Sequence, residues 1–117
     1  MSEYKIYHNP RCSKSRQTLS LLEENGVTPI VIEYLKTPPS TTELSNIVKL
    51  LDVSPQDIMR KKETEYKEAG LDNSDLTDDQ QFELMTKYPK VIERPIVVAN
   101  GKAAIGRPPE NVLSLID

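Results

Sequence analysis

Two short apolar runs near the start of the chain, separated by a helical segment, constrain its fold more than any other feature. The first run is Tyr4–Tyr7, and the second lies within Val27–Leu35, which contains three consecutive β-branched residues typical of a buried strand. Between them, helix signals begin near Ser13 and end at Gly26. Because a helix joins the two runs, we expect them to pair as parallel strands.

The middle of the chain changes to a helical pattern. Ser40 with Glu43 three residues later forms a capping box, a signal for the start of a helix. Ser54, followed by a proline, marks a second start, and Thr77 marks a third. We therefore expect a helical insertion over about residues 40–89.

The end of the chain returns to strand patterns. Residues 95–99 and 102–105 are strand-like segments on either side of Asn100 and Gly101, the strongest short signal for a hairpin with a type I′ turn. A last helix is expected to begin within residues 107–110. This order predicts an α/β fold, namely a thioredoxin-like mixed sheet flanked by helices, with the insertion between the second and third strands.

Composition limits the range of functions. A chain of 117 residues fits a single domain over residues 1–117. The net charge of −3, the absence of Trp and the single Phe argue against a nucleic-acid partner. No stretch approaches the roughly 18 apolar residues of a membrane span, and no signal peptide is recognised at the start. We expect a cytoplasmic protein with no membrane partner.

Cys12 is the only cysteine, so an internal disulfide is impossible. It lies where the first strand ends and the first helix begins, and the free N–H groups at that position stabilise a thiolate. The cationic neighbours Arg11, Lys14 and Arg16 act in the same direction. A lone cysteine is otherwise often a small buried hydrophobic residue. The polar, cationic loop favours a reactive thiol instead.

The residues around Cys12 restrict its chemistry further. Ser15 stands at the second position of a C-x-x-C pair, so an external thiol must resolve any adduct on Cys12. His8, the only histidine, either stabilises the thiolate or serves as a structural hydrogen-bonding group. One Cys and one His are too few ligands for a closed zinc site, so no metal is expected.

Three arginines lie beside prolines or within the insertion. Arg94 precedes Pro95, Arg107 precedes another proline, and Arg60 lies among the helices. The donor fork of arginine suits tetrahedral oxyanions. Each of the three is alternatively a solvated surface charge, Arg60 most of all because two lysines follow it. Pro95, at the entrance of a strand, is a candidate for a cis proline.

Three segments together resemble the glutaredoxin-linked arsenate reductase family. They are Tyr7–Arg16, which carries an H-N-P-x-C motif, Glu93–Val98, which carries R-P-I-V-V, and Gly106–Pro108. The resemblance extends over essentially the whole chain. It implies a thioredoxin-like fold and a cytoplasmic enzyme of arsenical resistance that reduces arsenate to arsenite.

The resemblance also implies roles for individual residues. Cys12 matches the nucleophile that attacks arsenic, while His8 and Ser15 match positions that favour its thiolate. The remaining matches are the oxyanion ligands Arg60, Arg94 and Arg107 and the cis proline Pro95. Glutathione would attack the Cys12–arsenate adduct as a co-substrate, and glutaredoxin would supply the remaining reducing equivalent. No bound cofactor is implied.

Two alternatives belong to other functional classes. A non-enzymatic regulator of the Spx type, which binds RNA polymerase, would share the fold. Those regulators carry a C-x-x-C switch, whereas this chain has Ser15, and they lack the arginine that Arg107 supplies. A glutathione-dependent reductase of another small electrophile would keep the same thiol chemistry, and the sequence separates it poorly from an arsenate reductase.

Overall fold

The computed structural model describes residues 3–116, which form two compact units. One unit runs up to Thr37 and resumes at Arg94, and the other is Pro38–Glu93. The second unit contains the helical insertion expected between the second and third strands. That the whole chain acts as a single domain stays a prediction.

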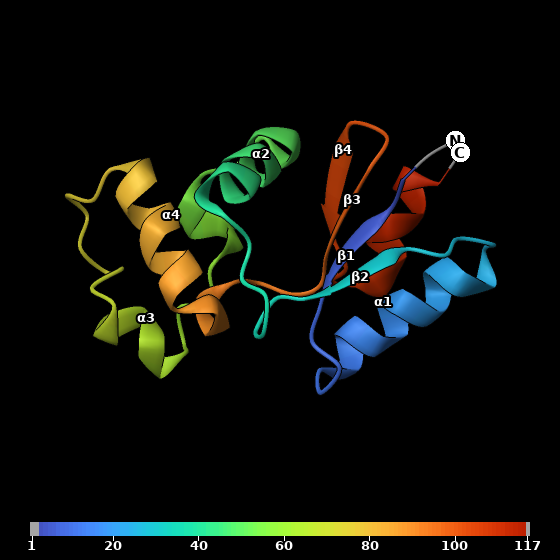
Figure 1. The fold of residues 1–117 in the computed structure, drawn as a ribbon, viewed down its shortest axis with the longest axis horizontal. Helices are drawn as coiled ribbons and strands as arrows, with labels where there is room; N and C mark the ends of the chain where they lie inside the picture. The colour runs from blue at the N-terminus through green and yellow to red at the C-terminus, as the bar shows by residue number, and fades with distance from the viewer. Residues whose placement is uncertain (1–2, 117) are drawn as a thin grey trace. The chain divides into compact units, whose positions relative to one another are not determined.

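The first unit contains a mixed sheet of four strands within the described residues, in the order β2-β1-β3-β4 (Figure 1). Strand β1 pairs in parallel with β2, as the sequence predicts, and antiparallel with β3, which in turn pairs antiparallel with β4. The mixed sheet is therefore confirmed. The strands are β1 (Lys5–His8), β2 (Ile30–Glu33), β3 (Ile96–Ala99) and β4 (Lys102–Ile105).

The tight turn between β3 and β4 is the one expected from the sequence. Asn100 and Gly101 have φ angles of 55° and 71°. A type I′ turn requires positive φ at both central residues, which asparagine and glycine adopt at low cost. This turn sets the register in which Ile96 faces Ile105.

Helix α1 (Ser13–Glu24) and the 3₁₀ helix η3 (Pro109–Leu115) pack on one face of this sheet (Figure 1). The final helix was expected from the sequence, but its 3₁₀ form was not. With three residues per turn, Val112 and Leu115 lie on the same side of η3, and both are buried. The core of the unit consists of Ile6, Leu22, Val27, Val97, Ala99, Val112 and Leu115.

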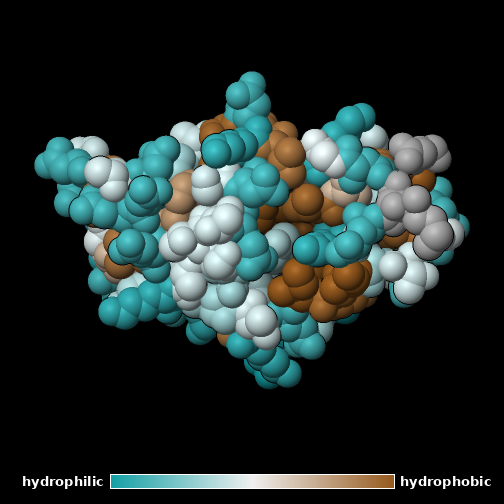
Figure 2. All heavy atoms as spheres, turned by 45° about the horizontal axis from the view of Figure 1, so that its top comes forward, coloured by the Kyte–Doolittle hydropathy of each residue, from teal (hydrophilic) through white to brown (hydrophobic). Residues whose placement is uncertain are grey.

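The sequence predicts that β2 is a buried strand, but in the structure it is partly exposed. The side chains of Ile30 and Val31 are 50% and 45% exposed, and the space-filling view shows hydrophobic residues reaching the surface (Figure 2). The reason is that β2 lies at one edge of the sheet, with β1 as its neighbour. β-branched residues favour a pleated surface, and they do not by themselves require burial on both faces.

The second unit consists of short helices around its own core. The predicted capping box at Ser40 forms, and the helix start predicted at Thr77 also carries one; each side chain accepts the N–H three residues on. Within residues 3–116 no helix is long and apolar enough to cross a membrane. The helices are α2 (Thr41–Leu51), η1 (Pro55–Ile58), α3 (Thr64–Glu68), α4 (Asp78–Lys87) and η2 (Pro89–Val91).

Close packing explains why a glycine, Gly106, lies between β4 and Arg107. A Cβ at this position would lie 2.5 Å from Thr18 Oγ1 and 2.8 Å from Pro95 Cγ, closer than van der Waals contact allows. Thr18 is fully buried and its hydroxyl donates to the Lys14 carbonyl at 2.8 Å, so it has little room to move. Gly106 therefore permits α1 and the Pro95 segment to approach each other.

We expect Gly106→Ala to lower the free energy of unfolding by about 2 kcal/mol, the usual cost of overpacking a buried site. Urea denaturation measures this loss. In the Thr18→Ala background the same substitution should cost less, because two of the three close contacts disappear. Strictly additive losses would contradict the steric explanation.

Candidate active site

The sheet topology gathers three chain segments beside Cys12. Because β1 and β3 are antiparallel, the end of β1, which leads to Cys12, lies beside the start of β3, which follows Arg94. Strand β4 is antiparallel to β3, so its end, which leads to Arg107, reaches the same edge. Residues far apart in the sequence therefore meet at one end of the sheet.

Cys12 is the residue immediately before α1. Its backbone is extended, with φ −93° and ψ 123°, and its carbonyl accepts the first helical bond from Arg16 N at 3.0 Å. The preceding loop is closed by Cys12 N–H, which donates to Asn9 O at 3.0 Å, and Asn9 Oδ1 accepts from Arg11 N at 3.0 Å. The half-buried thiol thus lies at the helix end where N–H groups have no intrahelical partner.

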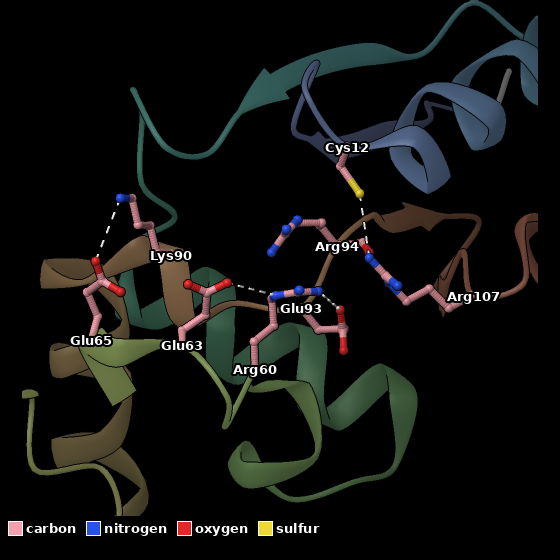
Figure 3. A network of polar contacts seen from close by, with 8 residues as sticks. All are labelled: Cys12, Arg60, Glu63, Glu65, Lys90, Glu93, Arg94 and Arg107. Carbon is pink, nitrogen blue, oxygen red and sulfur yellow. Dashed lines mark hydrogen bonds and ion pairs between the residues drawn. The ribbon is translucent and has the colours of Figure 1, made fainter. Parts of the chain in front are cut away.

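Arg94 and Arg107 both lie beside the sulfur. Arg107 Nη2 is 3.5 Å from Cys12 Sγ, and Arg107 Nε donates to the Arg94 carbonyl at 2.7 Å (Figure 3). The Arg94 guanidinium also stabilises the thiolate. Two of the three arginines proposed as oxyanion ligands are thus adjacent to Cys12. The backbone carbonyl of Arg94 orients the Arg107 guanidinium.

The pKa of the Cys12 thiol is lowered from its ordinary value. Burial raises this pKa, but it is outweighed by the Ser15 backbone N–H, the Arg94 guanidinium and the Lys14 backbone N–H together. Lys14 acts here through its backbone. The Arg16 side chain, which sequence reasoning placed among the cations around the thiol, instead donates to the Pro10 carbonyl at 2.9 Å.

His8 and Ser15 contact each other. Ser15 is fully buried, and its Oγ accepts from Asn9 N at 3.0 Å and lies 2.6 Å from His8 Nδ1. The Ser15 hydroxyl is therefore engaged within the loop, while its backbone N–H acts on the sulfur. The sequence left the position of His8 open, and in the structure its recorded partner is Ser15.

The pKa of His8 is also lowered. Burial lowers it most, the nearby Glu33 carboxylate raises it, and the Arg16 charge lowers it further. Nδ1 of a neutral His8 accepts a hydrogen bond from the Ser15 hydroxyl, and the Ser15 oxygen in turn accepts from Asn9 N–H. The neutral form of His8 thus satisfies His8 Nδ1, the Ser15 hydroxyl and the Asn9 N–H.

The peptide bond between Arg94 and Pro95 is cis, and so is the bond between Arg107 and Pro108. Sequence reasoning named only Pro95. It also missed Asn9 and Thr18, which shape the Cys12 loop and the contact with Gly106. The Asn9–Pro10 dipeptide, a common turn signal, could have pointed to Asn9.

Arg60 belongs to the helical unit and does not lie on an ordinary solvated face. Its Nη1 is 3.2 Å from Glu93 Oε1, and its Nε is 3.5 Å from Glu63 Oε1 (Figure 3). Lys61 and Lys62, which follow it, are exposed. The role of Arg60 as an oxyanion ligand stays a prediction.

Within residues 3–116 no group of three or more His, Cys, Asp or Glu side chains gathers in a way that could hold a metal ion.

The fold and the site together define a class of proteins that carry one reactive thiol. This thiol lies at a helix N-terminus beside a thioredoxin-like sheet, and its pKa is lowered there. Residues 7–115 match the sequence model described as the ArsC family, and the chain belongs to this family. The uncharacterized protein YfgD of Escherichia coli K12 is 54% identical over 115 residues, covering 97% of each chain. The arsenate reductase of Neisseria meningitidis serogroup B is 51% identical over 117 residues, covering 99% of this chain and 100% of that protein.

A solved structure gives the same result for the fold. The arsenate reductase from Vibrio cholerae superposes with a TM-score of 0.93 at 52% sequence identity, covering 97% of this chain and 98% of that one. The thioredoxin-like fold expected from the element order is thereby confirmed.

We expect the alkylation rate of Cys12 by iodoacetamide to reach its half-maximum below about pH 8.5, the ordinary value for a thiol. Arg94→Ala should raise this midpoint by about one pH unit, because an opposing charge next to the thiolate is lost. Arg11→Ala is the matched control, since its guanidinium has no recorded effect on the thiol. An unchanged midpoint in Arg94→Ala, or an equal rise in Arg11→Ala, would contradict the proposed cause.

His8 predicts a pH dependence of stability. Its pKa is lowered in the folded chain, so the unfolded chain binds the proton more tightly. The free energy of unfolding should therefore fall as the pH drops from about 6.5 through the lowered pKa. Urea denaturation at pH 7.5 and pH 5.5, conditions on either side of about 6.5, measures this fall. It should be smaller in His8→Asn; an equal fall in both proteins would refute the assignment.

Proposed function

We propose that this protein is an arsenate reductase that converts arsenate to arsenite through a covalent adduct on Cys12. Membership in the ArsC family and relatives named arsenate reductase support this proposal. The observation that carries it is the Cys12 thiol with Arg107 Nη2 at 3.5 Å and Arg94 beside it. A nucleophile and two oxyanion-binding groups are thus adjacent. The proposal includes Arg60, from the helical unit, as a third oxyanion ligand.

The first step is attack of the thiolate on arsenic. Thiolate and arsenate are both negative, and the guanidinium groups of Arg94 and Arg107 offset their repulsion. A Cys12–arsenic bond forms, and one arsenate oxygen leaves as water after it is protonated. Arsenic remains in the +5 state, so this step requires no reductant.

The next steps need two electrons, and the single cysteine leaves no second thiol in the chain. A glutathione thiolate attacks arsenic in the adduct and displaces a second oxygen as water. A glutaredoxin thiol then attacks the glutathione sulfur, giving a mixed disulfide and leaving arsenic in the +3 state on Cys12. Hydrolysis releases arsenite and the free thiol. Because both reductants belong to the reducing cytoplasm, we infer a cytoplasmic location.

The test is arsenate-dependent oxidation of NADPH in the presence of glutathione, glutaredoxin and glutathione reductase. We expect turnover with the native chain and none with Cys12→Ser, because the serine hydroxyl does not ionise at neutral pH. Absence of turnover above the Cys12→Ser background would refute the proposal. Turnover that requires glutathione, but occurs only with a different small electrophile, would favour the other thiol reductase instead.

A further inference from the structure

Arg60 lies between two carboxylates in the helical unit. Glu93 Oε1 is 3.2 Å from its Nη1, and Glu63 Oε1 is 3.5 Å from its Nε (Figure 3). The three side chains are 26%, 31% and 24% exposed for Arg60, Glu63 and Glu93, so the cluster is largely withdrawn from water.

The backbone holds this cluster in place. Arg60 N donates to Val91 O at 2.6 Å, and Glu93 N donates to Ile58 O at 2.8 Å, on either side of an isolated antiparallel bridge. Ile58 and Val91 are fully buried. The spacing between the Arg60 and Glu93 side chains is therefore set by rigid, buried backbone, unlike that of a flexible surface pair.

The two carboxylates leave part of the arginine fork available. A guanidinium has five N–H donors. One on Nη1 bonds to Glu93, and the buried Nε faces Glu63 at ion-pair distance without a hydrogen bond. Within residues 3–116 the structure records no partner for Nη2. A ligand oxyanion can therefore be met by Nη2 without displacing either carboxylate.

We propose that Glu63 and Glu93 are positioning residues that hold the Arg60 guanidinium ready to bind the oxyanion substrate. This inference rests on the proposed function, in which Arg60 is an oxyanion ligand. A free arginine side chain loses rotamer entropy when it is immobilised. Two carboxylates that immobilise it beforehand remove that cost from substrate binding.

The main test compares Glu93→Ala with Glu93→Gln. Loss of the carboxylate in Glu93→Ala should raise KM for arsenate about tenfold, the worth of one hydrogen bond to a charged group, with kcat within about twofold. Glu93→Gln should recover most of the affinity, because its amide oxygen still accepts from Nη1. Calorimetric titration of arsenate into the Cys12→Ser background gives the same comparison without turnover.

The chain offers a matched control in the same unit. Glu65 pairs with Lys90 at 3.7 Å, and the Lys90 side chain is 63% exposed (Figure 3). Glu65→Ala removes an equal charge and should leave KM and arsenate affinity unchanged. Glu63→Ala should raise KM less than Glu93→Ala, because its contact with Arg60 is longer. It also serves as the second variant if Glu93→Ala fails to fold.

Arg60→Ala separates the inference from the proposed function. If Arg60→Ala leaves KM and arsenate affinity unchanged, Arg60 is not an oxyanion ligand, and that part of the proposed function fails. If it raises KM, then adding Glu93→Ala should cause no further rise, because there is no guanidinium left to position. Additive effects, or a lower KM in Glu93→Ala, would overturn the positioning role and point to simple charge repulsion.

Discussion

The buried hydroxyl of Ser15 is the contact on which the geometry of the thiol loop depends. By accepting from Asn9 N–H and pairing with His8, it ties the first turn of α1 to the end of β1. This tie adds to the backbone bonds from Cys12 N to Asn9 O and from Arg16 N to Cys12 O, which hold the sulfur at the start of α1. A serine at this position therefore does more than remove a second thiol: it shapes the anion site that Cys12 occupies.

Local signals predicted the elements, whereas the site depends on contacts distant in sequence. The parallel pairing of β1 with β2, the capping boxes and the Asn100–Gly101 turn follow from a few adjacent residues. The approach of Arg94 and Arg107 to Cys12 requires the pairing of β1 with β3 and of β3 with β4. Sequence patterns suggested these arginines as oxyanion ligands. Only the pairing of the strands explains why they lie beside Cys12.

Two features show what local sequence patterns do not reveal. The prediction that β2 is buried was wrong because β2 lies at the edge of the sheet. Which strands pair decides that position, and the composition of a strand does not reveal its neighbours. Arg60 was hard to judge because the lysines beside it resemble a solvated face. Its carboxylate partner Glu93 is 33 residues away in the sequence. Such ion pairs have no local signal.

The exposed edge of the sheet has a consequence for the behaviour of the chain in concentrated solution. An edge strand with exposed isoleucine and valine is a template on which strands of other molecules can add without limit. Pro29, directly before β2, has no N–H to offer such a strand. At the other end Glu33 pairs with Lys36 at 3.6 Å and places charge beside the apolar run. Pro29 at one end of β2 and the Glu33–Lys36 pair at the other thus oppose the addition of a strand from a second molecule.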